Sequence, residues 1–199
     1  ADYTAECDEE LVYENATATD NCAEPVITET RDTISGDCPQ SFVIVRTFTA
    51  TDNCENNTVS QQSITVQDTT APELTIPADY IAECSDEHPL DDATATDNCG
   101  EVTIEMAVDT IAGDCAQAYT VTRTFTATDE CGNDTTAMQT IVIQDTTAPE
   151  FVEALPADTT VECSSVPEPV ILTATDNCQD VEVMFAELEE PGDCPNEWT

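Results

Sequence analysis

The stretch "AYTVTRTFTATD" (residues 118–129) alternates between two kinds of side chain. Apolar residues and Arg123 occupy one set of alternate positions from Tyr119 to Ala127, and threonines fill the positions between them. A period of two, with threonine and aromatic residues, is typical of a strand that is buried on one face. Residues 42–50 repeat the pattern, with Arg46 in the place of Arg123. At this inward-facing position we expect each arginine to form a structural ion pair with a Glu on a neighbouring strand. The sequence therefore predicts an all-β protein.

The chain is built from tandem repeats with a period of 77 residues. "QDTTAPE" occurs at residues 67–73 and again at residues 144–150. The cysteines follow the same period, with one insertion of two residues before the third set: Cys7, Cys22, Cys38 and Cys54, then Cys84, Cys99, Cys115 and Cys131, then Cys163, Cys178 and Cys194. A fixed period of this length indicates a repeat architecture. We place the repeats at residues 1–70, 71–147 and 148–199, and interpret the chain as a window from a longer array.

Composition excludes several classes of function. The chain has 43 acidic and 3 basic residues, with a net charge of −40, which excludes binding to nucleic acids and anionic membranes. No long apolar run is present, so we expect no direct membrane insertion. A single His and the lack of any C-x-x-C pair argue against zinc. No catalytic set recurs in the repeats, so we do not expect an enzyme. Four cysteines in each small repeat predict disulfides and an extracellular, cell-surface location.

Three motifs carry a family resemblance. "ATDNC", "TATDECGN" and "DTTAP" together resemble the hyalin-repeat (HYR-like) family of immunoglobulin-like modules. They look especially like the cysteine-containing version in very long surface adhesins of gliding and marine bacteria. The resemblance implies tandem immunoglobulin-like β-sandwich repeats in a linear rod, with about seven short strands in each repeat. The hyalin repeat proper places its cysteines elsewhere, so its disulfide pattern does not transfer.

The same resemblance implies a function. We expect a structural, adhesive array that forms a stalk or fibre, whose partners are neighbouring repeats of the chain and neighbouring chains. The alternative is a recognition module for a glycan or protein. Aromatic residues are only 5% of the chain and mostly fall on predicted core positions, which argues against that alternative.

Sandwich topology predicts which cysteines pair. Four cysteines allow three pairings. When successive strands alternate in direction, the first and third cysteines of a repeat lie at one end, and the second and fourth lie at the other. Because bonded cysteines need Cα atoms within about 7 Å, we predict bridges inside each repeat and a partner for Cys178 outside the chain. The predicted bridges are Cys7–Cys38, Cys22–Cys54, Cys84–Cys115, Cys99–Cys131 and Cys163–Cys194.

Acidic residues converge where one repeat meets the next. The linker "DTTAP" connects the acidic end of one repeat to the Asp-containing loops of its neighbour, much as "DNAP" does in a cadherin-type linker. A hard cation with six to eight oxygen ligands, Ca²⁺, suits such a cluster. For any single acid, a turn-forming role is an equally good interpretation. The candidate ligands are Asp68, Asp97, Asp129, Asp145, Asp176, Asp20, Asp52, Glu6, Asp37, Glu83 and Asp114.

Thr follows Asp, before a Thr or an Ile, in six places along the chain. This tripeptide looks like the short O-glycosylation signal of the bacterial groups whose adhesins the repeats resemble. The candidate sites are Thr33, Thr110 and Thr135, where a sugar would block edge-to-edge pairing of strands. The other interpretation is that Thr suits strands and Asp-Thr suits turns.

Overall fold

The computed structural model describes residues 1–115, 117–162 and 164–188. Every regular element of these residues is a β-strand. None of the described residues belongs to a helix that is long and apolar enough to cross a membrane. The strands are β1 (Tyr3–Glu6), β2 (Val26–Ser35), β3 (Phe42–Thr51), β4 (Asn57–Gln67), β5 (Glu73–Thr75), β6 (Tyr80–Glu83), β7 (Thr94–Thr96), β8 (Val102–Ala112), β9 (Tyr119–Asp129), β10 (Asp134–Gln144), β11 (Glu150–Phe151) and β12 (Ala174–Thr175).

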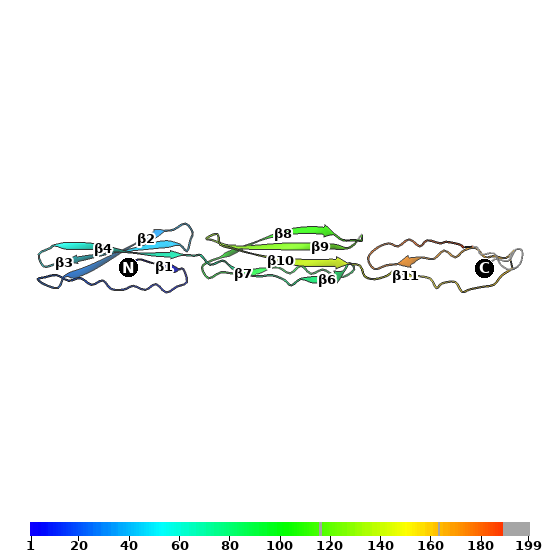
Figure 1. Ribbon diagram of the computed structural model, residues 1–199, viewed down its shortest axis with the longest axis horizontal. Coiled ribbons are helices and arrows are strands. Elements are labelled where there is room, and N and C mark those ends of the chain that lie inside the picture. Colours follow the sequence, from blue (N-terminus) through cyan, green and yellow to red (C-terminus); the bar gives the residue numbers. More distant parts are fainter. Residues whose placement is uncertain (116, 163, 189–199) are drawn as a thin grey trace. The chain divides into compact units, whose positions relative to one another are not determined.

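Two four-stranded sheets repeat one topology (Figure 1). The first has the order β1-β4-β3-β2 and the second has the order β6-β10-β9-β8. In each sheet the short strand pairs in parallel with its long neighbour, Tyr3 opposite Ile64 in one and Tyr80 opposite Ile141 in the other. Strands β2, β3 and β4 are antiparallel. The period of 77 residues in the sequence is therefore also a period in strand pairing.

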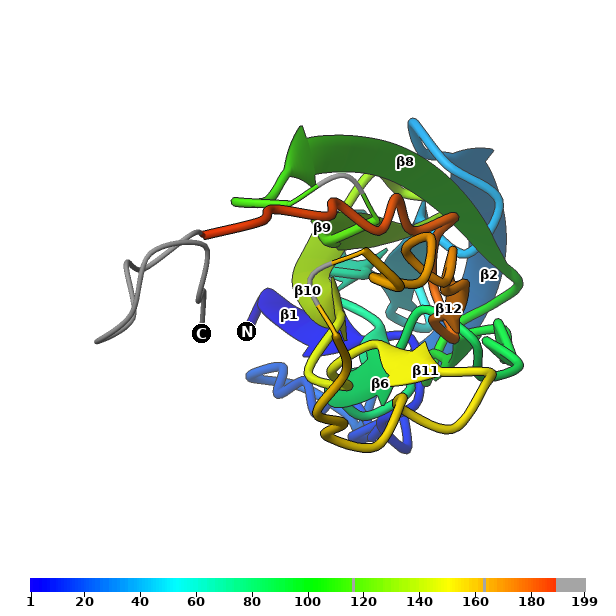
Figure 2. The same ribbon diagram turned by 90° about the vertical axis from the view of Figure 1, so that its right-hand side faces the viewer.

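A short strand pair forms a second, smaller sheet in the second repeat, and another short pair lies in the third repeat. Strand β5 pairs with β7, with Leu74 opposite Ala95, and β11 pairs with β12. Strands β8 and β9 curve with the twist that sheets of L-residues adopt (Figure 2). The second repeat has six strands, where the sequence predicts about seven. The all-β sandwich class predicted from the sequence is confirmed.

The described chain forms two compact units. Unit 1 comprises Ala1–Ala78, Asp91–Val108 and Arg123–Gln139, and unit 2 comprises Asp79–Leu90, Asp109–Thr122 and Thr140–Thr199. Unit 1 holds the first repeat together with part of the second, and unit 2 holds the rest of the second repeat together with the described part of the third. The repeat boundaries that we placed by the sequence period stay predictions.

The predicted alternation is present in the long strands, and it buries an arginine. On β9 the residues Arg123, Phe125, Ala127 and Asp129 are buried, whereas the threonines between them are partly exposed. On β3 Arg46 is 1% exposed. A buried guanidinium needs partners for its donors, because an unpaired charge in the interior is costly.

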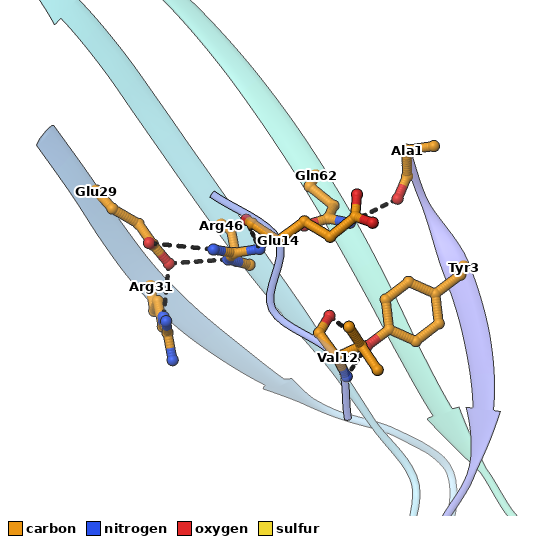
Figure 3. A network of polar contacts seen from close by, with 8 residues as sticks. All are labelled: Ala1, Tyr3, Val12, Glu14, Glu29, Arg31, Arg46 and Gln62. Carbon is orange, nitrogen blue, oxygen red and sulfur yellow. Dashed lines mark hydrogen bonds and ion pairs between the residues drawn. The ribbon is translucent and has the colours of Figure 1, made fainter. Parts of the chain in front are cut away.

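All three guanidinium nitrogens of Arg46 have partners, which come from the two neighbouring strands and a loop (Figure 3). Its Nε and Nη2 donate to the two carboxylate oxygens of Glu29 on β2, at 2.8 and 3.2 Å. Its Nη1 donates to Gln62 Oε1 at 2.8 Å and to the carbonyl of Glu14 at 3.1 Å. Hydrogen bonds from Arg46 and Arg31 lower the pKa of Glu29 to about 2. The prediction of a structural ion pair is confirmed here.

The equivalent arginine of the second repeat lacks a carboxylate partner among the described residues. Met106 stands where the first repeat has Glu29, and Arg123 Nε points to its Sδ at 3.4 Å. Arg123 Nη1 still donates to Gln139 Oε1 at 3.0 Å and to the carbonyl of Asp91 at 2.9 Å. Within the part of the chain that the structure describes, the expected ion pair is therefore absent at Arg123, because the neighbouring strand supplies a thioether in place of an acid.

Candidate functional site

The repeat junctions are closed by disulfides that connect one repeat to the next. In unit 1, Cys7 bonds to Cys99 and Cys38 bonds to Cys131, with Cα–Cα distances of 5.8 and 5.0 Å. In unit 2, Cys84 bonds to Cys178 across 5.6 Å. The rule is the same at both junctions: the first cysteine bonds to the second of the next repeat. At the first junction the third cysteine also bonds to the next repeat's fourth.

This pattern overturns the predicted pairing within repeats. The bridges Cys7–Cys38, Cys84–Cys115 and Cys99–Cys131 are wrong, because five of these six cysteines bond across a junction and Cys115 is a free thiol. Cys22 and Cys54 are not bonded to each other, and both are free and exposed. The predicted Cys163–Cys194 lies outside the described residues. The prediction grouped cysteines correctly by repeat end but overlooked that a five-residue linker brings the opposite end of the next repeat equally close.

Three aspartates, each two residues before a bonded cysteine, hold the loops that carry Cys99, Cys131 and Cys178. Asp97 Oδ1 accepts the amide of Cys99 at 2.8 Å, and Asp129 Oδ1 accepts that of Cys131 at 2.8 Å. Asp176 does the same for Cys178 at 2.9 Å. An aspartate that caps its own loop in this way is a turn former. The turn-forming interpretation is therefore confirmed for these acids, and it fixes the geometry of the bridges.

The carboxylates of the first junction do converge. Oxygens of Asp68 and Asp97 lie within 4.8 Å of each other and of Cys99 Sγ. Burial raises the pKa of Asp68, and the negative charges of Asp129, Asp97 and Glu6 raise it further, although the Thr70 amide opposes the shift. The shift means that the charged form of Asp68 is disfavoured here. A bound cation would relieve the repulsion between Asp68 and the neighbouring carboxylates.

The second junction repeats the cluster with its own acids. Oxygens of Glu83 and Asp145 lie within 4.8 Å of each other and of Cys178 Sγ. Asp176 is also near, since its charge acts on the pKa of Glu83. The sulfurs in both clusters belong to disulfides, so they offer no thiolate, and the available ligands are oxygens. A set of oxygens favours a hard cation over zinc.

At each junction a buried carboxylate oxygen lacks a hydrogen-bond partner among the residues that the structure describes. Asp97 Oδ2 and Asp176 Oδ2 are buried, and neither accepts a hydrogen bond from the described residues. The two aspartates are equivalent positions of successive repeats, so the orphaned oxygen recurs in register. Buried polar atoms are seldom left unpaired, and each such atom requires an explanation. These oxygens are the ones best placed to ligate a cation.

Several predicted ligands also accept hydrogen bonds from the chain itself. Asp129 accepts the Asn133 amide at 2.9 Å and the Asn133 side chain at 2.8 Å. Burial alone would raise the pKa of Asp129, but these bonds together with those from the Cys131 and Gly132 amides lower it. Glu6 accepts the Thr69 hydroxyl at 2.7 Å and the Thr69 amide at 3.0 Å, which lowers its pKa. Glu83 binds Thr146 through the same two groups. The glutamates thus hold the linker against the preceding strand.

Four predicted ligands lie away from both clusters. Asp20 and Asp52 cap the amides of Cys22 and Cys54, each at 2.8 Å, in the first-repeat loops equivalent to those of Cys99 and Cys131. Asp37 and Asp114 are exposed, and neither belongs to a group of ligand atoms found among the described residues. The set of candidate cation ligands therefore contracts to Asp68 with Asp97, and to Asp145 with Glu83 and Asp176.

The candidate glycosylation sites differ in their surroundings. Thr33 on β2 and Thr110 on β8 are exposed, and both strands are sheet edges. Thr135 is partly buried on β10, an inner strand of its sheet. A sugar on Thr33 or Thr110 would therefore protect a sheet edge, whereas a sugar on Thr135 would not. Glycosylation itself stays a prediction.

Comparison with known proteins relates the chain to cadherin structures. No protein-family model and no curated protein matches it. Protocadherin gammaB7 EC3-6 is 11% identical, with a TM-score of 0.35 over 82% of this chain and 54% of that one. Human CDH23 EC21-23 is 13% identical, with a TM-score of 0.34 over 90% and 83%. Protocadherin Gamma B2 EC3-6 is 13% identical, with a TM-score of 0.33 over 90% and 54%. The chain spans about half the length of two of these structures, and similarity at this level supports no statement on function.

Proposed function

We propose that the chain is part of the structural, adhesive repeat array of an extracellular surface protein, in which disulfides join successive repeats into a stalk or fibre. The observation that carries the proposal is the pair of bridges Cys7–Cys99 and Cys38–Cys131, both of which cross one junction. Disulfides form and persist in oxidising compartments, which supports an extracellular location.

Two bridges and a peptide linker give each such junction three covalent connections. Domains joined only by a linker ordinarily move relative to one another. Two additional bonds oppose bending at the joint, which is what a load-bearing array requires. The resemblance of "DTTAP" and "ATDNC" to hyalin-repeat modules supports the same role, in a linear rod of HYR-like repeats. The net charge of −40 would keep neighbouring arrays apart unless cations or sugars mediate their contact.

Force spectroscopy tests the load-bearing role. When the oxidised chain is pulled from its ends, the segment closed by Cys7–Cys99, with a sequence separation of 92, should not extend. Reduction should release about 300 Å of contour length from that segment, at about 3.4 Å per residue. The Cys22→Ser/Cys54→Ser variant should behave like the unmodified chain. Equal contour lengths with and without reductant would contradict the proposal, and saturable binding to a defined sugar would favour a recognition module.

We further propose that Ca²⁺ binds at the junctions through Asp68 with Asp97, and through Asp145 with Glu83 and Asp176. The paired carboxylates, the raised pKa of Asp68 and the recurring orphaned oxygens of Asp97 and Asp176 support this proposal. Backbone carbonyls and water would complete a shell of six to eight oxygens. The ion would neutralise charge that the fold has brought together.

Calorimetric titration with Ca²⁺ tests the cation sites. Asp97→Asn should abolish binding at the first junction and Asp145→Asn should abolish it at the second, each halving the number of sites. Asp20→Asn is the matched control, because Asp20 caps Cys22 as Asp97 caps Cys99 but belongs to no acid cluster found among the described residues. Absence of binding heat, together with linker proteolysis that a chelator does not change, would refute the proposal. Digests must be reduced before analysis, since the bridges hold cut pieces together.

A further inference from the structure

The first repeat carries an unused copy of the junction that the second repeat uses. Cys22 and Cys54 are equivalent by sequence to Cys99 and Cys131. Cys99 is 6% exposed and bonded to Cys7, and Cys131 is bonded to Cys38. Cys22 and Cys54 are exposed free thiols. The same loops are therefore covered and bonded in one repeat, and uncovered and unbonded in the other.

The uncovered loops already have the conformation that bonding requires. The Cys22 amide donates to Asp20 Oδ1 at 2.8 Å and the Cys54 amide donates to Asp52 Oδ1 at 2.8 Å. These are the distances found at the bonded Cys99 and Cys131. A partner would therefore meet loops that are already ordered, which lowers the entropic cost of docking.

A groove beside these loops gives a second, independent sign of a missing partner. It has a volume of about 280 Å³ and is lined by residues 14–18 together with Ile27, Phe48 and Ala50. In the second repeat the residues equivalent to 17–19 form β7, which pairs with β5. There the counterparts of Phe48 and Ala50, Phe125 and Ala127, are 2% and 0% exposed. The groove thus occupies the place of a strand like β5.

We propose that this end of the first repeat is a docking surface for another copy of the repeat. The partner's first and third cysteines would bond to Cys22 and Cys54, and the segment after its linker would add a strand in the groove. We infer this partner from the second repeat, where Cys7, Cys38 and β5 cover the equivalent surface. The inference rests on the geometry of the first repeat and does not depend on an adhesive role.

Each new bridge forms by thiol–disulfide exchange with an oxidised small-molecule disulfide such as oxidised glutathione. The thiolate of Cys22 attacks that disulfide and releases one reduced thiol. The partner's cysteine then attacks the mixed disulfide and releases the second. The two protein thiols are oxidised to one bridge, and one molecule of the oxidant is reduced to two thiols.

A tandem chain tests the proposal directly. Residues 1–77 are joined ahead of Ala1 of the full chain, because Ala1 and Ala78 are equivalent positions. In a glutathione redox buffer, we expect bridges from the added copy's Cys7 to Cys22 and from its Cys38 to Cys54. Peptide mapping without reduction identifies them, and maleimide labelling of Cys22 and Cys54 should fall about tenfold relative to the unextended chain.

Two variants make the outcome specific. In the added copy, Cys7→Ser with Cys38→Ser should restore labelling of Cys22 and Cys54 while the original junction stays intact. Cys115→Ser, which removes another exposed free thiol, should leave the new bridges unchanged. A bond between Cys22 and Cys54 would overturn the proposal, as would thiols that remain reactive in the tandem chain.

Discussion

Replacing Cys7 and Cys99 together by Ser is expected to lower the free energy of unfolding of unit 1 by about 4–5 kcal/mol. The bridge closes a segment with a sequence separation of 92 residues, and the chain-entropy model assigns about this much to a loop of that length. A bridge inside one repeat, such as the predicted Cys7–Cys38, would close a loop about a third as long and contribute about 1 kcal/mol less. Denaturant titration under oxidising conditions measures the difference.

The first repeat supplies the matched control for this experiment. Cys22→Ser with Cys54→Ser removes two cysteines that are exposed and unbonded, so stability should change by less than about 0.5 kcal/mol. If that control loses as much stability as the Cys7/Cys99 variant, the cysteines pair within repeats. Cys38→Ser with Cys131→Ser should be less damaging than its own loop length suggests, because Cys7–Cys99 already restrains the same segment.

Arg46→Ala is expected to destabilise the first sheet by about 3 kcal/mol. The substitution deletes the largest fully buried side chain and leaves Gln62 Oε1 and the Glu14 carbonyl without a donor. It also removes the guanidinium stacked 4.7 Å from the Phe48 ring centroid. Thermal unfolding measures the loss, and Arg31→Ala is the control, since Arg31 is half exposed and holds Glu29 from the surface.

The pH dependence of the stability difference between Arg46→Ala and the unmodified chain separates the contribution of the Arg46–Glu29 ion pair from that of packing. The pKa of Glu29 is lowered from 4.5 to about 2, so its stabilising contribution is complete above pH 4.5 and declines as pH falls towards 2. The gap between Arg46→Ala and the unmodified chain should narrow over that window. A gap that stays constant would assign the effect to packing alone.

The second repeat offers the converse substitution. Met106→Glu places a carboxylate where Arg123 has only a thioether contact among the described residues, and should stabilise the second sheet by about 1 kcal/mol. For a chain of this size that corresponds to a rise of about 2–4 °C in Tm. A fall in Tm would show that the space beside Arg123 does not accept Glu in the Glu29 conformation.

The sequence patterns predicted the strands correctly, but they did not predict which cysteines form disulfides with each other. Alternation in residues 118–129 placed Phe125 and Ala127 in the core, where both are almost wholly buried. The recurrence of cysteines fixed which of them are equivalent. It could not fix their partners, because a period of 77 residues is equally compatible with bridges inside repeats and between them. Only the close approach of consecutive repeat ends distinguishes the two.

The sequence also could not show which aspartate oxygens remain without a hydrogen-bond partner. Asp97 and Asp129 are both preceded by "TAT" and both cap a cysteine loop. Asn133 donates to both oxygens of Asp129, whereas Asp97 Oδ2 has no partner among the described residues. The sequences differ after the aspartate, with "ECGN" following Asp129 and "NCGE" following Asp97. To predict from this difference which aspartate keeps an oxygen without a partner, one must know that the asparagine two residues beyond Cys131 folds back onto Asp129.

The bridges across the first junction also change what a cut in the backbone can do. A protease that cleaves the linker at residues 68–72 breaks the only peptide connection between the first two repeats, yet Cys7–Cys99 and Cys38–Cys131 still span the gap. The severed ends stay beside each other, with Glu6 retaining its bonds to Thr69 when the cut falls beyond that residue. Separating the two repeats would require hydrolysis and reduction at the same joint. The proposed extracellular array would thus accumulate backbone cuts without losing length.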